Sequence, residues 1–257
     1  MKVNFDTKQP ITWCPGCPNF CILESVKKAL SNLGKKKEEV VLTTGIGCHG
    51  KIFDYIDIGG IYCLHGRPIP TSIGIKLGNP KLSVLAFGGD GDTYAEGMAH
   101  FIHACRYNAD MTLIVHDNRA FSLTTGQATP TSQVGFKTKV EPKGEFLEPI
   151  NPIKLALVSG ATFVARVNAK DIEHTAEILE KAIKHKGFSF VEVLQDCLIF
   201  NKEVNCLDKM MEKVEDNSDD MEKAMGVAGR WDYNSTNQKI PIGIFYQKEK
   251  KSLIDNF

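Results

Sequence analysis

Apolar runs and amphipathic stretches alternate along most of this chain. The run Val84–Phe87 is apolar throughout, which is typical of an interior strand in a parallel sheet. Strands are predicted at Val40–Thr44, Ile61–Leu64, Val84–Phe87, Met111–Val115, Thr162–Val167 and Ser189–Leu194. Apolar residues recur at helical spacing between them, which predicts helices at Asn19–Leu33, Ser72–Leu77, Tyr94–Tyr107, Ile153–Ser159 and Asp171–Lys186. The alternation predicts an α/β fold with a mostly parallel sheet flanked by helices.

The alternation stops near residue 200. Beyond Asn201 the chain contains a charged stretch of one or two predicted helices, and then a strand-like segment at Lys239–Gln247. We therefore expect an α/β domain over residues 1–200 and a C-terminal extension over residues 201–257 that packs on the domain or on a partner subunit. The long loop Ala128–Pro152 is rich in proline and glycine, and loops of this length usually carry function or form an interface.

Composition narrows the class of protein. The 257 residues are 42% hydrophobic and 24% charged, with a net charge of zero. No strongly basic surface is implied, which argues against a nucleic acid partner. The N-terminus lacks the apolar core of a signal peptide, and no apolar run approaches membrane-spanning length. We expect a cytoplasmic protein without a membrane anchor.

Polar side chains stand just beyond two consecutive predicted strands. Asp90 follows Val84–Phe87 within the glycine-rich segment Gly88–Asp92, and Asn118 follows Met111–Val115. Parallel neighbouring strands would bring both side chains to the carboxyl edge of the sheet, where open α/β folds bind ligands. Carboxylate and amide oxygens suit Mg2+, and the glycines leave backbone amides free to face an anion at a helix N-terminus. The pattern predicts a site for a divalent metal ion and a diphosphate.

The cysteines form a second pattern. Eight cysteines without an export signal argue against a disulfide framework. Cys14 and Cys17 lie in the tight turn WCPGC, a geometry that lets two thiolates bind one metal ion or cluster. Cys48 follows the strand Val40–Thr44, and Cys197 follows the last core strand. Because strand ends gather at one edge, ligation is the favoured role for Cys48, with packing as the alternative.

One further polar pair stands beyond a strand. His65 and Arg67 follow Ile61–Leu64, where a histidine could donate to a cofactor and an arginine could pair with a carboxylate or phosphate. A surface loop with a structural hydrogen bond explains the same residues equally well.

The motifs together resemble a known family. A GDG segment followed at this spacing by a strand-end asparagine matches the signature of thiamine diphosphate enzymes. The order WCPGC, GIGC, HGR, GDGD, DN and LTTGQATPTS, from Trp13 to Cys197, resembles the beta subunit of 2-oxoacid:ferredoxin oxidoreductases, the pyruvate:ferredoxin oxidoreductase-like family. The resemblance implies the thiamine diphosphate-binding fold and the oxidative decarboxylation of a 2-oxoacid to acyl-CoA and CO2. Electrons would pass through a 4Fe-4S cluster to ferredoxin.

The resemblance also implies roles for single residues. The cluster ligands would be Cys14, Cys17, Cys48 and Cys197, and the Mg2+ ligands Asp90, Asn118 and the backbone carbonyl of Ala120. Thiamine diphosphate would contact Gly47, Cys48, His65, Gly89, Asp90, Gly91, Asp92, Asn118, Leu123 and Thr124. Substrate contacts would come from Lys51, Arg67 and Leu123, with His65 and Arg67 as the candidate catalytic residues.

The family supplies the glutamate that activates the cofactor from another subunit. No motif for that glutamate is present here, so the resemblance implies an alpha partner, coenzyme A, ferredoxin and a heterodimer or a dimer of heterodimers. The chain alone should be inactive.

Some positions depart from the family pattern. Cys197 stands between Asp196 and Leu198 instead of prolines, which leaves Cys21 and Cys206 as alternative ligands. Thr125 replaces a lysine and His49 replaces a small residue near the expected substrate pocket. Two other functions stay open: a non-redox thiamine diphosphate decarboxylase or synthase subunit, and a non-catalytic assembly subunit stabilised by zinc.

Overall fold

Strands of the described chain form one mostly parallel sheet. The computed structural model describes residues 3–202, 207–214, 219–235 and 237–257. Within these ranges the sheet has eight strands in the order β2-β1-β3-β4-β6-β5-β8-β7. They are β1 (Val40–Thr44), β2 (Gly59–Tyr62), β3 (Ser83–Gly89), β4 (Met111–Asp117), β5 (Phe163–Asn168), β6 (Phe188–Leu194), β7 (Met211–Lys213) and β8 (Ile240–Gln247). Every neighbouring pair is parallel except β5 and β8. The predicted fold class is confirmed.

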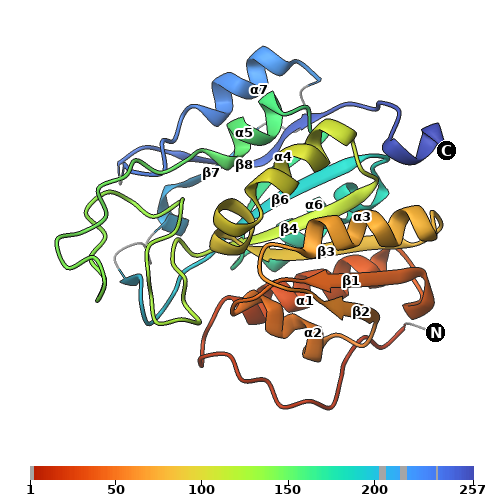
Figure 1. Cartoon of the computed structure of the whole chain (residues 1–257), viewed down its shortest axis with the longest axis horizontal. Helices are drawn as coiled ribbons and strands as arrows, with labels where there is room; N and C mark the ends of the chain where they lie inside the picture. Colours follow the sequence, from red (N-terminus) through yellow and green to blue (C-terminus); the bar gives the residue numbers. More distant parts are fainter. Residues whose placement is uncertain (1–2, 203–206, 215–218, 236) are drawn as a thin grey trace.

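Helices cover both faces of the sheet (Figure 1). They are α1 (Asn19–Asn32), α2 (Ile52–Tyr55), α3 (Pro68–Gly78), α4 (Met98–Tyr107), α5 (Pro152–Val158), α6 (Ile172–Lys184) and α7 (Met221–Ala228). One apolar core lies between the sheet and α1, α2 and α6, and a second lies between the sheet and α3, α4, α5 and α7. The architecture is therefore a three-layer sandwich, which explains why the interior strands are apolar on both faces.

Local sequence accounts for most helix positions. In α1 the buried residues Ile22, Val26, Ala29 and Leu30 recur along one face of the helix. Helix α6 begins where the Asp171 side chain accepts a hydrogen bond from the His174 amide. Other elements differ from the predicted ranges. Helix α3 starts at Pro68 rather than Ser72, because proline fits a first helical turn that needs no amide donor.

The register of three neighbouring strands sets the functional edge. Gly89 of β3 pairs with His116 of β4, and Asp117 of β4 pairs with Leu194 of β6. The next residues along these strands therefore leave the sheet together at its carboxyl edge. They are Asp90, Asn118 and Gln195.

Residues beyond 201 add to the same sheet. The predicted strand at Lys239–Gln247 is β8, which runs antiparallel beside β5, and α7 packs on α5. The division between residues 1–200 and 201–257 stays a prediction, and Cys206 lies outside the described residues. No helix in the described part of the chain is long and apolar enough to cross a membrane.

Candidate functional site

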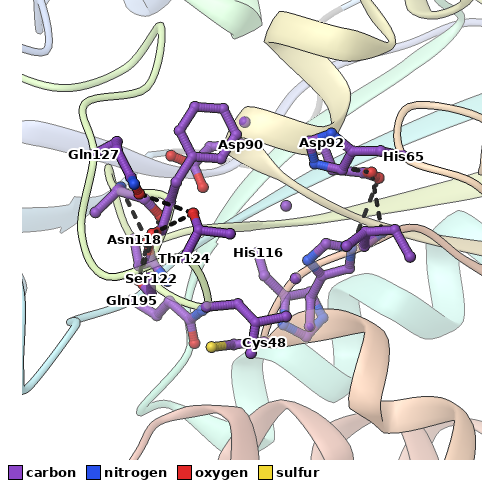
Figure 2. A pocket seen from close by; sticks show the side chains of 18 residues that line it. Cys48, His65, Asp90, Asp92, His116, Asn118, Ser122, Thr124, Gln127 and Gln195 are labelled. Carbon is purple, nitrogen blue, oxygen red and sulfur yellow. Dashed lines mark hydrogen bonds and ion pairs between the residues drawn. The ribbon is translucent and has the colours of Figure 1, made fainter.

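The carboxyl ends of β1, β3, β4 and β6 surround a pocket of about 520 Å³, shown in Figure 2. Residues from the loops after each of these strands line it, together with His65 from the loop after β2. The structure brings together eleven residues predicted from the sequence: Gly47, Cys48, His65, Gly89, Asp90, Gly91, Asp92, Asn118, Ala120, Leu123 and Thr124. Their ligand roles stay predictions.

Asp90 presents a buried carboxyl group to this pocket. Its side chain is 3% exposed, and its Oδ2 accepts hydrogen bonds from the hydroxyls of Thr129 at 2.6 Å and Thr131 at 3.2 Å. Burial raises the pKa of Asp90 to about 6, and the two threonine hydroxyls oppose that rise. A divalent cation beside Asp90 would favour the charged carboxylate, so this residue fits a metal site.

A second carboxyl group stands close behind Asp90. Asp117 is fully buried, and its Oδ1 accepts hydrogen bonds from Thr131 Oγ1 at 2.9 Å and from the Arg119 amide at 3.0 Å. Burial, the charge of Asp90 and the charge of Glu192 raise the pKa of Asp117 well above its usual range. Bringing two carboxyl groups together in a dry site costs free energy unless a cation or a proton compensates.

Asn118 begins a tight turn at the end of β4. Its Oδ1 accepts from the Ala120 amide at 3.1 Å and from Ser122 Oγ at 3.2 Å. Between them, Arg119 has a left-handed backbone with φ of 60°, which is uncommon outside glycine. The turn holds the side-chain oxygen of Asn118 close to the main chain of Ala120. A metal site that uses this oxygen together with the Ala120 carbonyl oxygen requires such an arrangement.

Asp92 holds three loops of the pocket together. Its Oδ1 accepts from the backbone amides of Gly66 at 2.8 Å and Ile46 at 3.2 Å. Its carboxylate also lies 3.6 Å from His65 Nε2 and 3.7 Å from His49 Nε2. Asp92 starts a short π-helical segment, Asp92–Glu96, an irregularity that is frequent at functional sites. This contact set makes Asp92 the structural anchor of the loops after β1 and β2.

Three of the lining residues that were not among the predicted ligands are buried and polar. His49, His116 and Gln195 are each at least nine-tenths buried, and Nε2 of both histidines and Oε1 of Gln195 have no hydrogen-bond partner among the described residues. Buried polar atoms are normally paired, so these atoms fit a pocket completed by a polar ligand. In the sequence, His49 is signalled by its departure from the family pattern, and His116 and Gln195 only by their positions at strand ends. A single histidine or glutamine at a strand end resembles a packed core residue.

Four cysteines line a neighbouring cavity of about 70 Å³. They are Cys14, Cys17, Cys48 and Cys197. Burial first, and then the nearby thiol groups of the other three, raises the pKa of Cys17 to about 11. Cys48, Asn118 and Ser122 also line the larger pocket, so the two cavities share these three residues.

Short contacts hold the cysteine segments against one another. Trp13 Nε1 donates to the Cys48 carbonyl at 2.7 Å, and Cys197 Sγ accepts from Ser122 Oγ at 3.3 Å and from the Phe200 amide at 3.4 Å. Cys21 does not line this cavity. No three His, Cys, Asp or Glu side chains of the described ranges converge to hold a single metal ion. Thiolates of a four-iron cluster bind different iron atoms and stand further apart than the ligands of one zinc ion.

Two predicted substrate residues lie outside the pocket lining. Lys51 lines the cysteine cavity, and its Nζ donates to the Thr12 carbonyl at 3.3 Å. Arg67 caps the start of α3 and donates to the carbonyls of Gly66 and Glu96. These are structural contacts of a surface loop, and the roles of Arg67 in catalysis and substrate binding stay predictions.

Comparisons with known proteins agree with this geometry. Residues 45–193, more than half of the chain, match the family described as "Thiamine pyrophosphate enzyme, C-terminal TPP binding domain". The 2-oxoacid:ferredoxin oxidoreductase subunit beta of Saccharolobus solfataricus is 46% identical over 92% of this chain and 82% of that protein. A 2-oxoglutarate synthase subunit of Methanocaldococcus jannaschii is 33% identical over 99% of this chain and 94% of its own length.

A solved structure extends the likeness to three dimensions. The 2-oxoglutarate:ferredoxin oxidoreductase of Magnetococcus marinus, with 2-oxoglutarate, coenzyme A and succinyl-CoA bound, superposes with a TM-score of 0.92. It shares 33% identity and covers 98% of this chain and 86% of that chain. This chain belongs to the family of 2-oxoacid:ferredoxin oxidoreductase beta subunits, with a thiamine pyrophosphate-binding domain over residues 45–193.

Proposed function

We propose that this beta subunit takes part in the CoA-dependent oxidative decarboxylation of a 2-oxoacid to acyl-CoA and CO2, with electrons passed through a 4Fe-4S cluster to ferredoxin. One observation carries the proposal: the pocket that contains Asp90 lies beside the cavity that contains the four cysteines, and both are lined by Cys48, Asn118 and Ser122. A non-redox enzyme with the same pocket has no need for four cysteines beside it.

In this proposal Asp90, Asn118 and the Ala120 carbonyl hold Mg2+, which in turn binds the diphosphate of thiamine diphosphate. A polar ligand here is supported by the buried carboxyl of Asp90 and by the atoms of His49, His116 and Gln195 that have no hydrogen-bond partner within the described ranges. When bound, thiamine diphosphate supplies the electron sink for decarboxylation. The chain binds and orients this cofactor.

Cys14, Cys17, Cys48 and Cys197 are the proposed cluster ligands. The hydrogen bonds that Ser122 and the Phe200 amide donate to Cys197 Sγ support this choice, because donors to cluster sulfurs tune the reduction potential. Cys21 is less suited as a cluster ligand, since it does not line the cavity that contains the four cysteines. The short path through Cys48 would let electrons leave the cofactor directly.

The remaining parts of the reaction come from outside this chain. None of the described residues that line the pocket is a glutamate, which supports an alpha subunit that supplies the activating glutamate in a heterodimer or a dimer of heterodimers. Lys51 and Leu123 stay our candidates for substrate contacts, and Leu123 is exposed at the pocket. Ferredoxin and coenzyme A complete the proposed partners, in the cytoplasm.

Metal and activity measurements on the anaerobically purified complex test this function. We expect iron and sulfide in equal amounts, a visible absorbance that dithionite bleaches, and reduction of ferredoxin or viologen with one member of a 2-oxoacid panel. The panel contains pyruvate, 2-oxoglutarate and branched-chain and aromatic 2-oxoacids. Thiamine diphosphate binding without iron would instead indicate a non-redox decarboxylase or synthase. Zinc without thiamine diphosphate binding would indicate an assembly subunit.

A further inference from the structure

Arg119 is a buried arginine in the turn that carries two of the proposed magnesium ligands. It stands between Asn118 and Ala120, the two residues whose oxygens are proposed to face the metal ion, and it is only 3% exposed. Burying a guanidinium group costs free energy unless its donors are paired. A short turn at the mouth of a ligand pocket needs no arginine for its backbone geometry alone, so its side-chain contacts are informative.

The Arg119 side chain reaches away from the pocket toward the C-terminal part of the chain. Its Nε donates to the Thr131 carbonyl at 3.0 Å, and its Nη2 donates to the carbonyl of Tyr233. The guanidinium carbon lies 5.5 Å from the centre of the Trp231 ring, within range of a cation–π contact. The guanidinium therefore links the turn after β4 to a segment more than a hundred residues later in sequence.

Both ends of this link have an uncommon backbone. Arg119 has φ of 60° and Tyr233 has φ of 66°. Left-handed backbone in bulky residues costs about 1–3 kcal/mol and persists only where the surroundings enforce it. Tyr233 is held in turn by its hydroxyl, which donates to Glu192, and by Arg166, which donates to that hydroxyl. The anchor point for Arg119 is therefore itself rigid.

The main chain of Arg119 is fixed as well. Its amide donates to Asp117 Oδ1 at 3.0 Å, and its carbonyl accepts from Ser132 Oγ at 2.7 Å and from Asn201 Nδ2 at 3.3 Å. Thr131, whose carbonyl accepts from the guanidinium, also donates through its hydroxyl to Asp90. Arg119 thus contacts, directly or through one residue, each of the groups proposed to bind Mg2+.

We propose that Arg119 is a positioning residue of the magnesium site. Its side chain is fixed to residues 231–233 and thereby holds Asn118 and Ala120 in the geometry that binds Mg2+. Through Thr131, Arg119 also holds Asp90. The proposal rests on the proposed function, since it assumes Mg2+ and thiamine diphosphate at this pocket. It gives the C-terminal region a role in the site: Trp231 and Tyr233 form the surface against which the metal-binding turn is set.

The test compares Arg119→Gln and Arg119→Lys with Arg230→Gln as the matched control. Arg230 is exposed and adjoins Trp231, so the control removes the same charge from the same region without touching the turn. Each protein is purified as the full-length chain with its partner subunit. Thiamine diphosphate binding is then titrated by calorimetry over a range of Mg2+ concentrations, and the cluster is followed by electron paramagnetic resonance.

We expect Arg119→Gln to raise the Mg2+ concentration for half-maximal cofactor binding by about 10- to 100-fold, the usual effect of removing a group that orients metal ligands. Saturating Mg2+ should restore kcat, the cluster signal should not change, and Arg119→Lys should recover part of the affinity. Arg230→Gln should match the wild type. If Arg119→Gln does not fold, the smaller change in Arg119→Lys decides the question.

The outcomes separate this inference from the proposed function. An unchanged Mg2+ requirement in both Arg119 variants, with normal cofactor binding by the wild type, would overturn the positioning role alone. Loss of kcat that saturating Mg2+ does not restore would also overturn it, because a purely structural defect predicts that result. Absence of Mg2+-dependent cofactor binding in the wild type would overturn the proposed function instead.

Discussion

Replacing Thr129 with valine should make magnesium binding more sensitive to pH. The Thr129 hydroxyl donates to Asp90 Oδ2 at 2.6 Å and helps to keep the pKa of this carboxyl from rising above about 6. A hydrogen bond to a charged group contributes about 1.5–3 kcal/mol, and about 1.4 kcal/mol corresponds to one pKa unit. Removing it should therefore raise the pKa of Asp90 by about one or two.

The variant should bind Mg2+ more weakly at lower pH, because Mg2+ must displace the proton of the Asp90 carboxyl group. At pH 7 the wild-type carboxyl is mostly ionised, whereas the variant carboxyl is half or more protonated, so Mg2+ should bind the variant about two- to tenfold more weakly. At pH 9 both carboxyls are ionised, and the difference should shrink to less than about twofold. Calorimetric titration of Mg2+ with thiamine diphosphate at both pH values measures this.

The control for this prediction is Thr112→Val. Thr112 is another buried threonine of the same region of sequence, and its hydroxyl donates to the Ala182 carbonyl far from the pocket. Its removal should leave magnesium affinity unchanged at both pH values. A loss of affinity in Thr129→Val that is equal at pH 7 and pH 9 would refute the reasoning, because it would not depend on the protonation of Asp90.

Three other predictions follow from the contacts described above. Cys197→Ala should lose or convert the cluster signal in electron paramagnetic resonance, whereas Cys21→Ala should keep it; the opposite result would exchange their roles. Arg166→Met should lower the free energy of unfolding by about 3–5 kcal/mol, measured by thermal denaturation, because it leaves the buried Glu192 carboxylate without its cationic partner. A change below about 1 kcal/mol would show that the ion pair contributes little to stability. Gly45→Ala should abolish cofactor binding in calorimetry, because the Cβ of the alanine would lie 1.9 Å from Asp92 Oδ2 and displace Asp92, which anchors the pocket loops. Normal cofactor binding would show that the loops adjust.

The positions of the strand ends could be predicted because they depend on local pattern. Strand β1 has the predicted bounds, and Asp90 and Asn118 line one pocket because adjacent parallel strands end at the same edge. Strand β2 starts two residues before the predicted run Ile61–Leu64. Its exposed Gly59 and Gly60 carry no hydrophobic signal, so the period of the pattern could not locate its start.

The buried polar groups could not be predicted, because they depend on strand register. Arg166 and Glu192 are separate charged residues within apolar stretches of the sequence, and only the pairing of β5 with β6 places them opposite each other. Arg119 gave no signal either, since its anchor at Tyr233 is distant in the chain. Arg67 shows the converse: its position just beyond a predicted strand does not place it in the pocket lining.

The contact between Arg119 and Tyr233 also has a consequence for the order of folding. Residues 231–233 are synthesised more than a hundred residues after the turn that follows β4, so this turn gains its anchor only after the strand ends around the pocket have been made. Domains generally fold as units during synthesis. A nascent chain that has not reached residue 231 would therefore lack the anchor of its proposed magnesium site, and cofactor loading would need residues 231–233 in place.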